Sequence, residues 1–191
     1  MLTSITPLGE RGRGNRWGVT TTAYAVGCGL GGATTGLVLG SVGALLPPLP
    51  VLLVAGTVCL LAAVADLAPG RLPLGRRQVD ERWLGLYRGW VYGLGFGFQL
   101  GLGVVTVVSS AATFAVLAVA LLTQSPLVGA LVGLVFGAAR ALPAVFVRRV
   151  DSPDRLRQLA RRVERHSRSA ARTTVVALTT GGTVLVAGAL L

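Results

Sequence analysis

Two charged residues, Asp66 and Arg140, lie inside otherwise apolar stretches of the 191-residue sequence. At the 1.5 Å rise per residue of an α-helix, each lies about 20 Å from an uncharged turn, Pro47–Pro50 or Thr123–Pro126. Charges at membrane depth are costly, and they are usually paired or mark the path of an ion or substrate. The matched depths predict an intramembrane ion pair between Asp66 and Arg140. The alternative is that both residues lie near the inner membrane face and extend their charged groups to its polar surface.

The two cysteines, Cys28 and Cys59, are the residues that thiol–disulfide chemistry would use. On straight helices they lie about 27 Å and about 12 Å below the outer turn, whereas a disulfide needs Cα atoms within about 7 Å of each other. Both also belong to rows of small residues, where cysteine packs as a small apolar side chain. A redox pair is therefore the alternative and packing is the main interpretation.

The apolar run 89–122 combines polar side chains with glycines. Gln99 and Thr106 either line a hydrated path or bond to neighbouring helices and backbone carbonyls. As one straight helix this run would be about 51 Å long, against about 30 Å for a hydrocarbon core. It must therefore tilt, protrude or break, and the sequence favours a break at Gly101–Gly103 or at Ser109–Ser110. The residues predicted to form a path or its hinge are Gly31, Gln99, Gly101, Gly103 and Thr106.

Residues that carry catalysis in soluble enzymes are sparse in this sequence. The one histidine, His166, lies among arginines, and it has no partners at metal-ligand spacing. A G-x-G-x-x-G pattern at 27–32 lacks the preceding strand and the later acid that a dinucleotide site requires. We therefore expect no enzyme activity, no catalytic residues, no metal and no cofactor.

The elements that must position these residues are apolar helices. Apolar residues make up 52% of the chain and charged residues only 13%. A membrane span needs about 20 apolar residues, and five runs approach or exceed that length: 18–46, 51–68, 89–122, 127–147 and 173–191. The sequence therefore predicts an all-α polytopic membrane bundle of about five transmembrane helices.

Glycines recur at every fourth residue along several of these runs, which places them on one face of a helix. Such stripes let helix backbones approach closely in lipid. We therefore expect a tight bundle whose helices meet along glycine faces, in the manner of a glycine zipper. The predicted packing glycines are Gly32, Gly36, Gly40, Gly89, Gly93, Gly97, Gly129, Gly133 and Gly137.

The basic residues cluster between the apolar runs. Of 18 in total, three precede the first run, five separate the second run from the third, and nine separate the fourth from the fifth. The positive-inside rule places all three clusters in the cytoplasm. We therefore predict a multi-pass protein of the inner (plasma) membrane with a cytoplasmic N-terminus and an outside C-terminus. The basic loops then contact the bilayer's anionic headgroups and not nucleic acid.

These features divide the chain into six segments: an N-terminal cytoplasmic arm at 1–17, a first repeat at 18–68, a basic loop at 69–88, a second repeat at 89–147, a second basic loop at 148–172 and a last span at 173–191. We expect the arm to be loose. Ser152 and Pro153 are typical of a helix start, and the arginines beyond them suit an amphipathic helix on the inner membrane surface. A solvated linker is the alternative for that second loop.

The first two pairs of runs look duplicated. Residues 16–34 and 88–106 align with identical residues at several positions, among them Arg16 with Arg88 and Gly29 with Gly101. Internal repeats are common in transporter folds. We therefore predict a two-fold internal repeat, with chance similarity between glycine-rich segments as the alternative.

Residues 88–191 resemble the second half of the CcdA/DsbD-like cytochrome c biogenesis family of transmembrane proteins. The resemblance lies in "RGWVYGLGFGFQLGLG", in "GLVFGAARALPAV" and in the basic loop with the Gly-containing last helix. That family has six helices and moves reducing equivalents outward through a membrane-embedded cysteine pair, and relatives of its scaffold export small solutes and metal ions. The family's Pro-Cys position in its fourth helix falls near Gly103, where this chain has neither residue, and Gly31 occupies the matching place in the repeat, so the resemblance implies the scaffold without its redox cysteines.

Together these observations favour an inner-membrane protein of CcdA/DsbD-like type that transports a small solute or ion between its two repeats. A non-transporting membrane subunit is the main alternative, with its glycine stripes bound to a partner membrane protein or to another copy as a homo-oligomer. A thiol-disulfide electron conduit through Cys28 and Cys59 is the third hypothesis.

Overall fold

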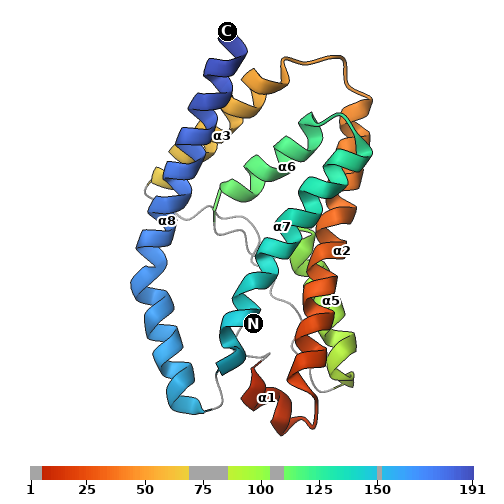
Figure 1. Ribbon diagram of the computed structural model, residues 1–191, viewed down its shortest axis with the longest axis vertical. Coiled ribbons are helices and arrows are strands. Elements are labelled where there is room, and N and C mark those ends of the chain that lie inside the picture. The colour runs from red at the N-terminus through yellow and green to blue at the C-terminus, as the bar shows by residue number, and fades with distance from the viewer. Residues whose placement is uncertain (1–5, 69–85, 104–109, 150–151) are drawn as a thin grey trace.

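The protein is a bundle of α-helices (Figure 1). The computed structural model describes residues 6–68, 86–103, 110–149 and 152–191, and none of these residues forms a β-strand. The helices are α1 (Pro7–Gly12), α2 (Trp17–Ala44), α3 (Val51–Leu67), α5 (Gly89–Gly101), α6 (Ala112–Leu122), α7 (Pro126–Phe146), the short 3₁₀ helix η1 (Val147–Arg149) and α8 (Pro153–Leu190). The predicted all-α fold is thereby confirmed.

Several helices are suited to a membrane. Those long and apolar enough to cross one are the segments Trp17–Ala44, Pro126–Ala144 and Ser169–Leu190, while α3 and α6 are shorter apolar helices. Large apolar side chains point outward, and Leu61 and Val176, for example, are more than 60% exposed. Extensive exposed apolar surface of this kind marks contact with a membrane or a partner. The helices are therefore compatible with a membrane location, and the count of five crossings is still a prediction.

α2 and α7 pack in antiparallel directions, glycine against glycine. A Cβ at Gly32 would overlap the carbonyl oxygen of Gly133, and a Cβ at Gly36 would overlap that of Gly129. Close backbone approach through small residues is how helices associate in lipid. A Cβ would come within 3.0 Å of a neighbouring segment at every predicted packing glycine: Gly32, Gly36, Gly40, Gly89, Gly93, Gly97, Gly129, Gly133 and Gly137.

The third apolar run contains two helices: α5 runs alongside α2 in the same direction, and α6 crosses obliquely from α3 to the end of α2 (Figure 1). α5 lies beside the first half of α2, where Gly101 meets the backbone of Cys28. The end of α6 lies beside the last turn of α2, where Gly43 meets the backbone of Leu121. α5 and α6 thus contact opposite ends of α2, and that they form one membrane crossing is still a prediction.

The two halves of the predicted repeat are built differently. α2 is a continuous helix of 28 residues, whereas the matching run of the second half contains α5 and α6. α7 packs on α2, while α3 packs chiefly on α8 (Figure 1). The internal repeat is thus still a prediction.

α8 joins the second basic loop and the last span in one helix of 38 residues. It starts as predicted, since the side chain of Ser152 accepts a hydrogen bond from the N–H of Arg155 at 3.4 Å. Its apolar second half packs on α3, where Gly182 meets Gly56. The helix is about 57 Å long, which exceeds the thickness of a hydrocarbon core, about 30 Å. Its basic and apolar halves are continuous, whereas the sequence predicts a separate amphipathic helix for the basic half.

In the described part of the N-terminal arm, residues Pro7–Gly12 form the helix α1, whereas the Gly and Arg content of the arm predicted a loose segment. Thr6 caps α1 by accepting a hydrogen bond from the N–H of Gly9 at 3.0 Å, and Pro7 occupies the first helical position. Both residue types are typical of a helix start. α1 lies across the ends of α2 and η1 (Figure 1).

Candidate functional site

The end of α5 is the point at which the third apolar run stops being a regular helix. α5 ends at Gly101, and Gly103 has a φ of 77°, a left-handed conformation that glycine adopts at no steric cost. α6 begins at Ala112. Residues 104–109, with the predicted path residue Thr106, lie outside the described residues. The predicted break at Gly101–Gly103 is therefore where α5 ends.

Side chains of α2 and α3 bond to the backbone groups on both sides of this break. Thr35 donates from Oγ1 to the carbonyl oxygen of Leu102 at 3.2 Å. The carboxylate of Asp66 accepts from the N–H of Ala111 at 2.7 Å and from the hydroxyl of Ser110 at 2.6 Å. An unpaired backbone N–H or C=O in lipid costs several kcal/mol, so these partners stabilise the interruption. The negative charge of Asp66 also suits the positive end of the α6 helix dipole.

Arg140 lies near the other side of the break. Its guanidinium carbon is 5.3 Å from the centroid of the Phe136 ring, which is a cation–π distance. A Cβ at Gly103 would be 3.1 Å from the same ring. Arg140 is also near enough to Tyr24 and Cys28 for its charge to act on both. Asp66 thus bonds to the start of α6, while Arg140 lies over a ring that borders Gly103 at the end of α5.

The predicted ion pair between Asp66 and Arg140 is not among the ion pairs of the described residues. Asp66 bonds to the start of α6, and Arg140 lies over Phe136. The first N–H groups of α6 have no helical partner, and this accounts for the bond from Ala111 to the carboxylate of Asp66. Direct pairing of the two charges therefore stays a hypothesis.

The other predicted path residues fall into two groups. Gly31 packs against the backbone of α5 and Gly101 against the backbone of α2, so both lie where the helices touch. Gln99 is partly exposed on α5. Gly103 alone among the described path residues lies beyond the end of the helix.

Cys28 and Cys59 are both free thiols in separate apolar clusters. Cys28 is 0% exposed in a cluster with Tyr24 and Phe96, and Cys59 packs beside Ala62. Their surroundings are those of small apolar side chains.

We expect the double variant Cys28→Ser/Cys59→Ser to fold and to keep the wild-type activity. A serine hydroxyl in a helix can donate to the carbonyl four residues earlier, so the loss of stability should be about 1 kcal/mol. Thermal unfolding in detergent and the transport assay below check this. A variant that folds normally yet has no activity would favour the thiol conduit.

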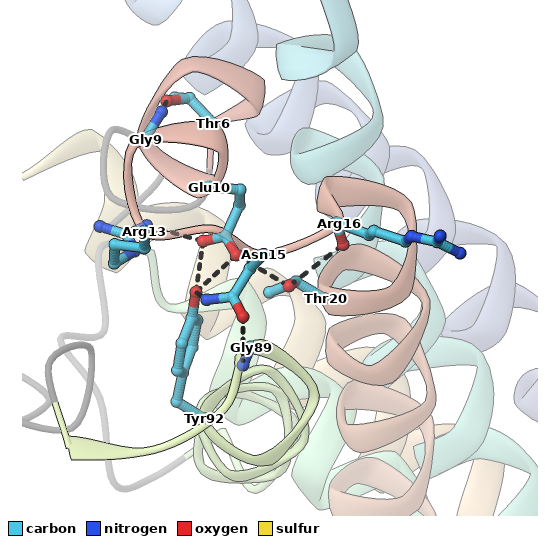
Figure 2. A network of polar contacts seen from close by, with 9 residues as sticks. All are labelled: Thr6, Gly9, Glu10, Arg13, Asn15, Arg16, Thr20, Gly89 and Tyr92. Carbon is cyan, nitrogen blue, oxygen red and sulfur yellow. Dashed lines mark hydrogen bonds and ion pairs between the residues drawn. The ribbon is translucent and has the colours of Figure 1, made fainter.

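A second polar cluster lies at the N-terminal ends of α2 and α5 (Figure 2). Its centre is Glu10, which is 0% exposed. The carboxylate accepts hydrogen bonds from Tyr92 at 2.5 Å, from Thr20 at 2.9 Å and from Arg13 at 2.6 Å. Burial by itself lowers the pKa of Arg13, but hydrogen bonds to Glu10 and Tyr92 outweigh it and raise that pKa above its ordinary value. The cluster therefore joins a buried carboxylate to the guanidinium of Arg13.

Sequence reasoning missed this cluster. Glu10 and Tyr92 are 82 residues apart in the chain, and one acid in a segment rich in Gly and Arg has the pattern of a solvated arm. The available signal was the helix start at Thr6 and Pro7, which would have brought Glu10 onto a helix.

Comparison with known proteins adds no family to this description. No protein-family model matches the chain, and no curated protein and no solved structure matches it. The function must therefore be argued from the break, its two charges and the apolar helices around them.

Proposed function

We propose that this chain is a small integral membrane transporter that binds its solute at the break between α5 and α6. The observation that carries the proposal is the interrupted run whose flanking backbone groups bond to Thr35 and Asp66. Irregular backbone at membrane depth is tolerated where protein surrounds it or where it lines a water-filled cavity. Transporters bind substrates and coupling ions at such interrupted helices.

The chemistry of the break favours a small polar solute with a cationic group. Asp66 and Ser110 offer oxygen atoms to a cation, while Arg140 offers a positive charge near the other end. A solute carrying both a cationic and an anionic group would use both ends of the break. Intramembrane charges commonly mark substrate and ion pathways.

The proposal includes the CcdA/DsbD-like scaffold and a place in the inner membrane with a cytoplasmic N-terminus. That family's Pro-Cys position falls near Gly103, where this chain has neither residue, and Gly31 occupies the matching place in the repeat, so transport without a thiol relay is the activity we assign to the scaffold. The two halves would move against each other around the break, as in other repeat-built transporters.

The alternative of a non-transporting membrane subunit would also account for the exposed apolar surface of α8. In the most apolar stretch of the segment Ser169–Leu190 of α8, only 6% of the residues are buried. Lipid covers such a surface in a transporter, whereas a partner helix would cover it in a membrane complex. A pull-down from membranes in mild detergent separates the two, because a transporter that acts alone leaves no stoichiometric partner.

The transport assay uses purified protein in liposomes and a panel of radiolabelled amino acids, polyamines and divalent metal ions. We expect uptake of at least one solute by the wild type, and uptake about tenfold slower with Ser110→Ala, because a hydrogen bond to the charged Asp66 is lost. Ser41→Ala is the matched control, since the Ser41 hydroxyl donates only to a carbonyl of its own helix. Uptake equal to that of empty liposomes for the whole panel would contradict transport, and uptake unchanged by Ser110→Ala would place the path elsewhere.

A further inference from the structure

The carboxylate of Glu10 is a buried charge that the proposed transport site does not use. A carboxylate taken out of water is very costly unless hydrogen bonds and a cation compensate it. Figure 2 shows three side chains, Arg13, Thr20 and Tyr92, converging on its two oxygen atoms. Hydrogen bonds to a charged acceptor are the stronger kind, so the position of Glu10 depends strongly on these donors.

The donors come from separate parts of the chain. Arg13 follows α1, Thr20 belongs to α2 and Tyr92 to α5. Asn15 adds a second connection, because its Nδ2 donates to the Tyr92 hydroxyl and its Oδ1 accepts from the N–H of Gly89, each at 3.3 Å. That N–H is one of the first in α5, which have no partner within the helix. The arm is thus bonded to the ends of two neighbouring helices.

α1 also covers the far end of α7. It contacts η1, the 3₁₀ helix that continues α7, and Val147 in η1 is 1% exposed. The arm therefore lies across the ends of α2, α5 and α7, the three helices of the close-packed unit (Figure 1).

α1 has six residues, and isolated helices shorter than about 12–15 residues are marginal in water. Its helical state therefore depends on docking to the bundle. We propose that α1 is a strap that closes one end of the α2–α5–α7 unit, and that the hydrogen bonds accepted by Glu10 hold it in place. In the predicted topology the strap lies at the cytoplasmic end. Its release would uncover Thr20 and Val147 whether or not the chain transports a solute.

Amide hydrogen exchange in lipid nanodiscs tests the strap directly. The N–H groups of Arg13 and Asn15, which donate to Gly9 and Glu10 carbonyls, are protected only while α1 is docked. We expect exchange in the arm to be at least about tenfold faster in Tyr92→Phe, which removes the hydroxyl that donates to Glu10. Tyr24→Phe is the matched control, because it removes a buried tyrosine hydroxyl that lies outside the cluster, and it should leave the arm unchanged.

Glu10→Gln gives a second variant that leaves the membrane helices untouched. The amide group has no negative charge to pair with Arg13, and it should release the arm as Tyr92→Phe does. Unchanged exchange in both variants, or an arm unprotected in the wild type, would overturn the proposal.

Thiol labelling tests whether the strap covers the end of α7. In a chain with both native cysteines replaced by serine, Val147→Cys should be nearly unreactive toward a membrane-impermeant maleimide. Adding Glu10→Gln should raise its labelling rate at least tenfold. Equal labelling rates with and without Glu10→Gln would overturn the proposal, and neither readout depends on the transport assay.

Discussion

Gly32→Ala should lower the stability of the bundle by about 1–3 kcal/mol, the usual effect of inserting a methyl group into a packed interior. The added Cβ would overlap the carbonyl oxygen of Gly133 on α7, and a backbone atom cannot move aside as a side chain can. The helices would have to separate, with loss of the contacts along both glycine stripes. Thermal unfolding in detergent, followed by circular dichroism, measures the change.

Gly181→Ala is the matched control for this prediction. Gly181 lies in the apolar part of α8, and a Cβ there would have no atom within 4 Å. Alanine is favoured over glycine in a helix interior by about 1 kcal/mol in water, so this change should be neutral or slightly stabilising. Equal effects of the two substitutions would show that the helices do not meet along α2 and α7 as described.

Asp66→Ala should destabilise the protein by about 2 kcal/mol or more and abolish uptake. The N–H of Ala111 and the hydroxyl of Ser110 would both lose their acceptor, and an unsatisfied buried donor such as the Ala111 N–H costs about 1–3 kcal/mol. The same change would remove the charge that we assign to solute binding. Asp66→Asn keeps one acceptor oxygen, so it should recover part of the stability without recovering uptake.

Asp154→Ala is the control for Asp66→Ala, because Asp154 also lies at a helix N-terminus but its side chain is 83% exposed. Water replaces its contacts, so the change in unfolding free energy should stay within about 0.5 kcal/mol. If Asp66→Ala were equally mild, its carboxylate would not be holding the start of α6.

Short stretches of sequence were sufficient to predict most of the helices and several of their ends. The apolar runs predicted the helices, Ser152 and Pro153 predicted the start of α8, and the glycines at 101–103 predicted where the third run would break. Each of these depends on neighbours in sequence, through capping, hydrophobic length or backbone freedom.

The long-range partners could not be read from the sequence in the same way. Asp66 stood out as a charge in an apolar run, yet nothing in the sequence indicated that its carboxylate would bond to the start of α6. The bond from Thr35 to Leu102 joins residues 67 positions apart, and threonine at that place also suits a bond within its own helix. Such contacts depend on which helix faces meet, which a single sequence with glycines on several faces does not specify.

The central claim is that a membrane surrounds these helices while the break in the third run is open to water. Ser110→Cys and Phe114→Cys test it in lipid nanodiscs, in a chain with both native cysteines replaced by serine. Phe114 lies one turn along α6 and is 37% exposed, and Ser110 is partly exposed at the start of that helix. We predict that a water-soluble maleimide labels Ser110→Cys within minutes and leaves Phe114→Cys unlabelled. Rapid labelling of Phe114→Cys, or no labelling of Ser110→Cys, would contradict the account.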